Sequence, residues 1–126
     1  MAKEFITPTR VHQTRGYSHA VRVGNTIYIS GQVGWDEQRK VSPVFEVQAT
    51  QALENLKRVL EAAGASVKDI VKITTYLKDL GDMPKYREAR EKYFSAPFPA
   101  STTVQIVSLA SPELLIEIEA IAVVDK

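Results

Sequence analysis

The segment LLIEIEAIAVV, residues 114–124, constrains the fold more than any other part of this 126-residue chain. Side chains alternate across a β-strand, so one face of this segment would be wholly apolar: Ile116, Ile118, Ala120, Ala122 and Val124. The other face would hold two carboxylates among apolar neighbours: Leu115, Glu117, Glu119, Ile121 and Val123. A strand of this kind belongs in a sheet that packs one face against a core.

The mixed face has two explanations. A second subunit that covers this face would bury its apolar side chains and admit a carboxylate where a ligand is bound or protonated. Alternatively, Glu117 and Glu119 are both solvated, and their apolar neighbours are incidental surface residues. Periodicity alone does not separate these explanations.

The first half of the chain predicts a hairpin and a helix. Gly24 and Asn25 join two short strands in HAVRVGNTIYISGQV, because both residue types tolerate the positive φ that a two-residue turn requires. Apolar residues at helical spacing predict a helix over residues 45–63, which Gly64 would end.

The second half predicts a strand, a helix and two more strands. DIVKITTYLKD alternates as a half-buried strand whose buried side would carry Val71, Ile73, Thr75 and Leu77. Asp82 would cap a helix that has Pro84 in its first turn and runs to about Phe94. TTVQIVSL and LLIEIEAIAVV complete a single α+β domain over residues 1–126, ordered β-β-α-β-α-β-β, with both helices on one face of a mixed sheet.

Composition excludes several classes of protein. The chain has no cysteine, so it has neither a disulfide framework nor a thiolate nucleophile. A formal net charge of +1, with both signs interleaved, argues against a broad nucleic-acid-binding surface. No apolar run reaches the roughly 20 residues of a membrane span, and MAKEFITPTR lacks the apolar stretch of a signal peptide. We therefore expect a cytoplasmic protein without membrane contact.

Motifs for metal, triad and nucleotide chemistry are missing from the sequence. His12 and His19 are seven residues apart with no third ligand indicated, so we expect no metal site. Ser30 and His19 would be needed for a Ser-His-Asp triad, but the G-x-S-x-G turn is not present. Neither GxxxxGK[ST] nor GxGxxG occurs, and we expect no cofactor.

Four segments together resemble the RidA family, also called YjgF or reactive-intermediate deaminases: YSHAVRVGNTIYISGQ, QALENLKRVLEAAGAS, DIVKITTYLKDL and LLIEIEAIAVV. The resemblance covers nearly the whole chain in the same order. It implies a chorismate-mutase-like fold and a homotrimer whose sheets pack at the centre, with each of three clefts lying between two subunits. It also implies hydrolysis of a small enamine or imine substrate, such as a 2-imino acid, without a metal or cofactor.

The resemblance assigns residues of this chain to the cleft by their motif positions. Glu119, rather than Glu117, would orient the attacking water or exchange a proton with it, and Ser30 would present its hydroxyl. The remaining residues would contact the substrate: Tyr17, Gly31, Ser101, Thr102 and Thr103. Trp35 would either roof the cleft or anchor a loop by packing.

One position departs from the family pattern. Imine-hydrolysing members are expected to read PARS where this chain reads PAST, so Ser101 stands in place of an arginine that binds the substrate carboxylate. The hydroxyl run that begins at Ser101 suggests a neutral or weakly anionic ligand, although threonine is also a good strand residue. Other cations could serve instead or could equally be solvated: Arg87 and Arg90, or Arg15 and Arg22.

Three functions remain open at this point. The first is a small-molecule hydrolase that deaminates an enamine, an imine or a related metabolite. The second is a non-catalytic trimer that binds a ligand or protects other proteins. The third is an endoribonuclease or translation inhibitor, which would need a basic groove with aromatic stacking; the near-zero net charge argues against it.

Overall fold

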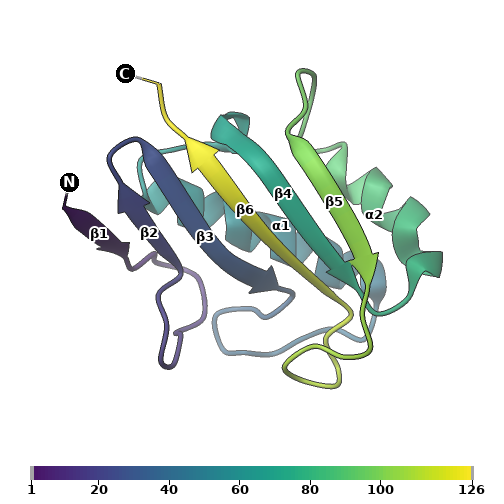
Figure 1. The fold of residues 1–126 in the computed structure, drawn as a ribbon. Coiled ribbons are helices and arrows are strands. Elements are labelled where there is room, and N and C mark those ends of the chain that lie inside the picture. The colour runs from purple at the N-terminus through teal and green to yellow at the C-terminus, as the bar shows by residue number, and fades with distance from the viewer. Residues whose placement is uncertain (1, 126) are drawn as a thin grey trace.

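The computed structural model describes residues 2–125 and shows a six-stranded sheet with two helices packed behind it (Figure 1). The strands lie in the order β1-β2-β3-β6-β4-β5, and only β4 and β5 are parallel to each other. The predicted α+β class is therefore confirmed. The elements are β1 (Lys3–Ile6), β2 (Ala20–Val23), β3 (Thr26–Val33), α1 (Phe45–Ala62), β4 (Ile70–Leu77), α2 (Met83–Arg90), β5 (Ala100–Gln105) and β6 (Ile116–Val123), with 3₁₀ turns at Val67–Asp69 and Leu80–Asp82.

The hairpin and the first helix lie where the sequence predicts them. β2 and β3 pair around Gly24-Asn25, and Gly24 has a φ of 60°. α1 ends at Ala62, and Gly64 then adopts a φ of 85°, a conformation that favours glycine.

The second helix is shorter than predicted. It ends at Arg90 rather than near Phe94, because the backbone then changes to tighter i→i+3 hydrogen bonds, such as that from Tyr93 N to Arg90 O at 2.9 Å. Asp82 occupies the N-cap position, but its side chain makes no capping hydrogen bond. The Asp79 carboxylate caps the preceding 3₁₀ turn instead, accepting a hydrogen bond from Gly81 N at 2.8 Å.

Two strand features differ from the sequence analysis. β1 was not predicted, since of its four residues only Ile6 is buried and the strand lies at the sheet edge. In β4 the register against β6 shifts between Ile70 and Lys72. Val71 is consequently 47% exposed rather than buried, whereas the rest of the predicted buried side, Ile73, Thr75 and Leu77, is fully buried.

β6 shows the two faces that its sequence predicts. Its apolar face lies against the helices, and Ile116, Ile118, Ala120 and Ala122 are at most 4% exposed. Full burial of one isoleucine side chain is worth about 1.5–3 kcal/mol, so this face holds β6 firmly in register. On the other face Glu117 is half-buried and Glu119 is exposed.

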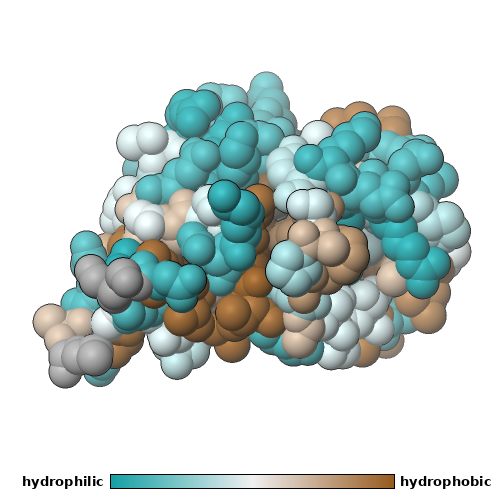
Figure 2. Space-filling model, turned by 90° about the horizontal axis from the view of Figure 1, so that it is seen from above, coloured by the Kyte–Doolittle hydropathy of each residue, from teal (hydrophilic) through white to brown (hydrophobic). Residues whose placement is uncertain are grey.

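The face of the sheet away from the helices carries a row of large side chains. Strand pairing places Phe5, Val21, Tyr28 and Ile121 side by side across four strands. Phe5 is 64% exposed and Tyr28 is 52% exposed. Figure 2 shows hydrophobic atoms along the lower edge of the view, on this side of the molecule, whereas hydrophilic atoms dominate the opposite side. We call this surface the open face; patches of this kind commonly mark an interface.

Two buried amides of α1 hold the chain where β3 ends beside the start of β6. Gln48 donates to the carbonyl oxygens of Ser42 and Glu113 and accepts from Leu115 N, all within 2.9 Å. Asn55 donates to the carbonyl oxygens of Val33 and Trp35, both at 2.9 Å. These bonds fix the start of β6 and the exit from β3.

No helix within residues 2–125 has the length and apolar character needed to cross a membrane.

Candidate functional site

A β-bulge in β3 shapes the candidate site. The register between β3 and β6 shifts between Ile29 and Gln32, which leaves Ser30 and Gly31 out of the regular pairing. Ser30 N donates to His19 O at 2.9 Å, and the Ser30 hydroxyl donates to Ser18 O at 2.6 Å. The bulge thereby holds the loop that carries Tyr17. Because the Ser30 hydroxyl proton is engaged, this oxygen has only its acceptor capacity left for a ligand.

Gly31 makes room for the carboxylate of Glu117. A Cβ atom at position 31 would overlap the Glu117 carboxyl group, so a larger residue would push that carboxylate out of its position. Burial, followed by the nearby Glu119 carboxylate, raises the pKa of Glu117 above its usual value. The bulge therefore brings exposed backbone and a carboxyl group of raised pKa to the same place.

A groove of about 580 Å³ runs along this bulge, and we call it the bulge groove. It is lined by Tyr17, Ser30, Gly31, Trp35, Glu117 and Glu119, with Arg15 and Arg39 also contributing. Four residues that the resemblance assigns to the cleft, Tyr17, Ser30, Gly31 and Glu119, are thus brought together within one chain. Its two carboxylates, Glu117 and Glu119, lie on the face of the sheet that the helices leave uncovered (Figure 1).

Aromatic and imidazole rings form the wall behind the bulge groove. The Trp35 ring contacts His12 edge-on at a centroid distance of 5.0 Å, and the Arg39 guanidinium lies 4.5 Å above the same ring. Trp35 therefore lines the groove and also packs against His12 and Arg39.

Two histidines, His12 and His19, pack behind Trp35 with their rings edge-on to each other. Burial, with smaller contributions from His19 and Arg39, lowers the pKa of His12 to about 4. The Nε2 atom of His19 lies 2.8 Å from His12 O, and its Nδ1 atom lies 3.0 Å from the Gln32 amide nitrogen. These contacts fit an imidazole that donates from Nε2 and accepts at Nδ1. Within residues 2–125, no three His, Cys, Asp or Glu side chains are grouped as metal ligands.

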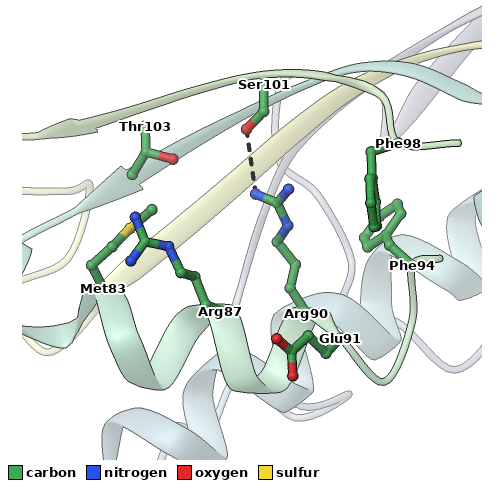
Figure 3. A pocket seen from close by; sticks show the side chains of 8 residues that line it. All are labelled: Met83, Arg87, Arg90, Glu91, Phe94, Phe98, Ser101 and Thr103. Atoms are coloured by element: carbon green, nitrogen blue, oxygen red, sulfur yellow. Dashed lines mark hydrogen bonds between the residues drawn. The ribbon is translucent and has the colours of Figure 1, made fainter. Parts of the chain in front are cut away.

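The other predicted site residues lie on β5, apart from the bulge groove. β6 and β4 separate β5 from β3 in the sheet. Ser101 and Thr103 face α2 and line a second pocket of about 350 Å³, which we call the α2/β5 pocket (Figure 3). Thr102 faces the opposite way, and its hydroxyl accepts a hydrogen bond from Lys72 Nζ at 2.7 Å. One chain alone therefore does not bring all the predicted residues together.

Two residues of the site region were not assigned to it from sequence. Glu117 lines the bulge groove beside Glu119, and the two-residue spacing along β6 was the available signal. Tyr76 on β4 pairs in register with Glu117, and burial together with the Glu119 and Glu117 carboxylates raises the pKa of Tyr76. No sequence signal points to Tyr76, because its position depends on the pairing of β4 with β6.

Comparison with known proteins shows which family this chain is related to. The family model described as Endoribonuclease L-PSP matches residues 7–124. A RutC family protein of Pyrococcus abyssi is 42% identical over 125 residues, covering 97% of this chain and 98% of the relative. A protein of Salmonella typhimurium named 2-iminobutanoate/2-iminopropanoate deaminase is 38% identical over 127 residues, covering 98% of both chains.

Solved structures of related proteins have the same fold. The crystal structure of RidA from an Antarctic Psychrobacter has a TM-score of 0.92 at 39% identity, covering 96% of this chain and 99% of the other. The structure of TdcF from E. coli with bound serine has a TM-score of 0.91 at 33% identity, covering 97% and 99%. The chain belongs to the RidA/YjgF family.

The pKa of Glu117 predicts how its removal changes stability with pH. Since the folded state binds this proton more tightly than the unfolded state does, stability falls as the pH rises from the unfolded pKa, about 4.3, through the raised folded pKa. We expect Glu117→Gln to raise the thermal unfolding temperature at pH 7 and to lose that advantage below about pH 4, where the carboxyl group is protonated in both states.

The control for this experiment is Glu88→Gln, which removes an exposed carboxylate from α2. It should leave the unfolding temperature nearly unchanged at either pH. An unfolding temperature of Glu117→Gln that is no higher than that of the parent protein at pH 7 would contradict the assigned cost of the Glu117 charge.

Proposed function

We propose that this protein hydrolyses small imines or enamines to carbonyl compounds and ammonia, at clefts between the subunits of a homotrimer. The observation that carries the proposal is the pair of carboxylates, Glu117 and Glu119, beside the exposed backbone of the β3 bulge. Relatives of similar length that are named 2-iminobutanoate/2-iminopropanoate deaminase support this reaction class.

Imine hydrolysis requires few catalytic groups from the protein. A protonated imine carbon is already electrophilic, so the site has to hold the substrate and place a water molecule beside a proton acceptor. We assign the acceptor role to Glu119, which is the more exposed carboxylate of the bulge groove. Water adds to the imine carbon and gives up one proton to Glu119, which forms a carbinolamine. The carbinolamine nitrogen then takes a proton, and its C–N bond breaks as the hydroxyl group loses its proton and becomes the carbonyl, which releases ammonia. Glu119 can deliver the proton that it accepts from water to the leaving nitrogen, so the reaction does not require a protonated Glu117.

A trimer would explain two features that a single chain leaves unexplained. The open face exposes Phe5 and Tyr28 in a continuous row with Val21 and Ile121, which a neighbouring copy would bury. The predicted site residues are divided between the bulge groove and β5, which a neighbouring copy would bring together. Both features favour clefts that draw residues from two subunits.

The substrate class is best argued from the size and lining of the groove. Its volume of about 580 Å³ suits a small metabolite, and its lining combines carboxylates with aromatic rings. The E. coli TdcF structure contains bound serine, an amino acid that carries a carboxylate. A small carboxylic acid derivative is therefore the substrate class that we favour.

The endoribonuclease function that the family model's name indicates has less support in this chain. An RNA-cleaving groove has to attract phosphates, whereas the bulge groove sets Glu117 and Glu119 against Arg15 and Arg39 and has no excess of positive charge. The formal net charge of +1 provides no compensating attraction. A non-catalytic binding trimer would use the same groove, and the carboxylate variants below separate it from a hydrolase.

The trimer is tested by mass in solution. Sedimentation equilibrium should give three times the 14.0 kDa mass of one chain. Tyr28→Asp should dissociate the assembly, because it places a charge in the apolar row of the open face, whereas Val47→Asp on the exposed surface of α1 should not. A mass near 14.0 kDa for the parent protein would refute the trimer.

The hydrolase is tested with imines produced in solution by an amino-acid oxidase. Glu119→Gln should lower the rate of keto-acid formation by at least about 100-fold, the usual contribution of a positioned proton acceptor, while leaving the assembly and its unfolding temperature intact. Glu117→Gln should lower this rate by a smaller factor than Glu119→Gln does. Equal losses in the two variants would contradict the assignment of Glu119, and full activity of Glu119→Gln would contradict the mechanism.

A further inference from the structure

The α2/β5 pocket contains two positive charges that no nearby carboxylate neutralises. Arg87 and Arg90 lie three residues apart on α2, and both direct their guanidinium groups toward β5 (Figure 3). Within residues 2–125, neither arginine has a carboxylate oxygen within 4.0 Å. Glu91 also lines the pocket, but its carboxylate lies on the helix side, away from the strand. Two like charges in one pocket are stabilised by a bound anion.

Arg90 is held in position by its neighbours. Its guanidinium carbon lies 5.4 Å from the centre of the Tyr86 ring and 5.9 Å from that of Phe94. The Tyr86 ring is itself buried, and its hydroxyl is 2.6 Å from that of Thr75. Arg90 Nη1 donates to Ser101 Oγ at 3.3 Å, the interaction drawn in Figure 3. A guanidinium has five N–H donors, so donors remain for a ligand.

Apart from the hydroxyl of Thr103, the rest of the pocket lining is apolar. Phe94 and Phe98 stand on one side of Arg90, and Met83 lies at the other end beside Arg87 (Figure 3). Phe98 is 64% exposed, which leaves its ring available to a bound molecule. The pocket therefore offers cationic donors beside a hydrophobic wall, an arrangement that suits an anionic group attached to an apolar chain.

The surroundings of Arg90 differ from those of a solvated helix face. Lys85, Glu88 and Lys92 of the same region are exposed and form the solvated surface that the sequence KYREAREKY allows. Arg90 is half-buried between two aromatic rings and the strand. The helix thus has one solvated face and one face that points its arginines into a pocket.

We propose that Arg90, assisted by Arg87, binds the carboxylate of the substrate and that Phe94 and Phe98 contact its apolar side chain. This inference rests on the proposed function, since it supplies the substrate class for the same cleft. The ligand would be a small monocarboxylate with an apolar side chain, such as a 2-imino acid or the 2-oxo acid formed from it. A guanidinium recognises a carboxylate through two parallel hydrogen bonds, which a lysine cannot reproduce.

The test compares a stable 2-oxo acid with its neutral amide, using 2-oxobutanoate and 2-oxobutanamide in equilibrium titrations. The parent protein should bind the acid more tightly than the amide by on the order of ten- to a hundredfold, the strength of a charge-assisted hydrogen bond. Arg90→Gln should remove most of this preference, and Arg90→Lys should retain part of it. Lys92→Gln, which removes an exposed positive charge outside the pocket, should leave the preference unchanged.

The preference for acid over amide does not depend on catalysis, and a merely structural effect would weaken both ligands equally. Full retention of the preference in Arg90→Gln, or its absence from the parent protein, would overturn the inference. If imines are hydrolysed but the preference does not require Arg90, the proposed function stands and the carboxylate subsite is wrong. If the preference requires Arg90 but no imine is hydrolysed, the subsite stands and the proposed function is wrong.

Discussion

The packing of β6 against the helices positions the carboxylates of the site. Because side chains alternate along a strand, the register that buries Ile116 and Ile118 also places Glu117 and Glu119 on the open face. A slip of one residue would push two carboxylates into the core and expose four apolar side chains, which is far more costly than any contact in the groove. The helix-packed core therefore determines where the chemistry of the open face lies.

Features that reduce stability gather around the β3 bulge. Glu117 is half-buried beside a second carboxylate, and the position of its carboxyl group requires a glycine at residue 31. His12 Nδ1 and Gln32 Oε1 are buried without a hydrogen-bond partner among the described residues. Buried polar groups without partners and paired like charges are costly in a core, but they are common where a protein binds or reacts with a ligand.

Local sequence patterns predicted the elements that carry strong periodicity. Residues 114–124 and 45–63 show clear alternation and helical spacing, and the structure has a strand and a helix there. β1 is too short to produce a pattern, and the exposure of Val71 depends on a register shift that arises only when β4 pairs with β6. Strand pairing is a tertiary property, so a single sequence does not contain it.

The candidate site was predictable to a similar extent. The resemblance assigned Tyr17, Ser30, Gly31 and Glu119, and these residues share one groove. It did not indicate that Ser101 and Thr103 face α2, because that depends on the parallel pairing of β5 with β4. The spacing of Arg87 and Arg90 was visible in the sequence, but their direction toward β5 was not.

The central claim is that one cleft uses the Glu119 carboxylate of one subunit and the Arg90 guanidinium of another. Chains carrying Glu119→Gln and chains carrying Arg90→Gln can be unfolded, mixed in equal amounts, refolded together and assayed at imine concentrations below KM. Random assembly would give about a quarter of the clefts both native groups. We therefore expect the mixture to hydrolyse imines well above the rate of either variant refolded alone. A mixture no more active than the separately refolded variants would contradict the shared cleft.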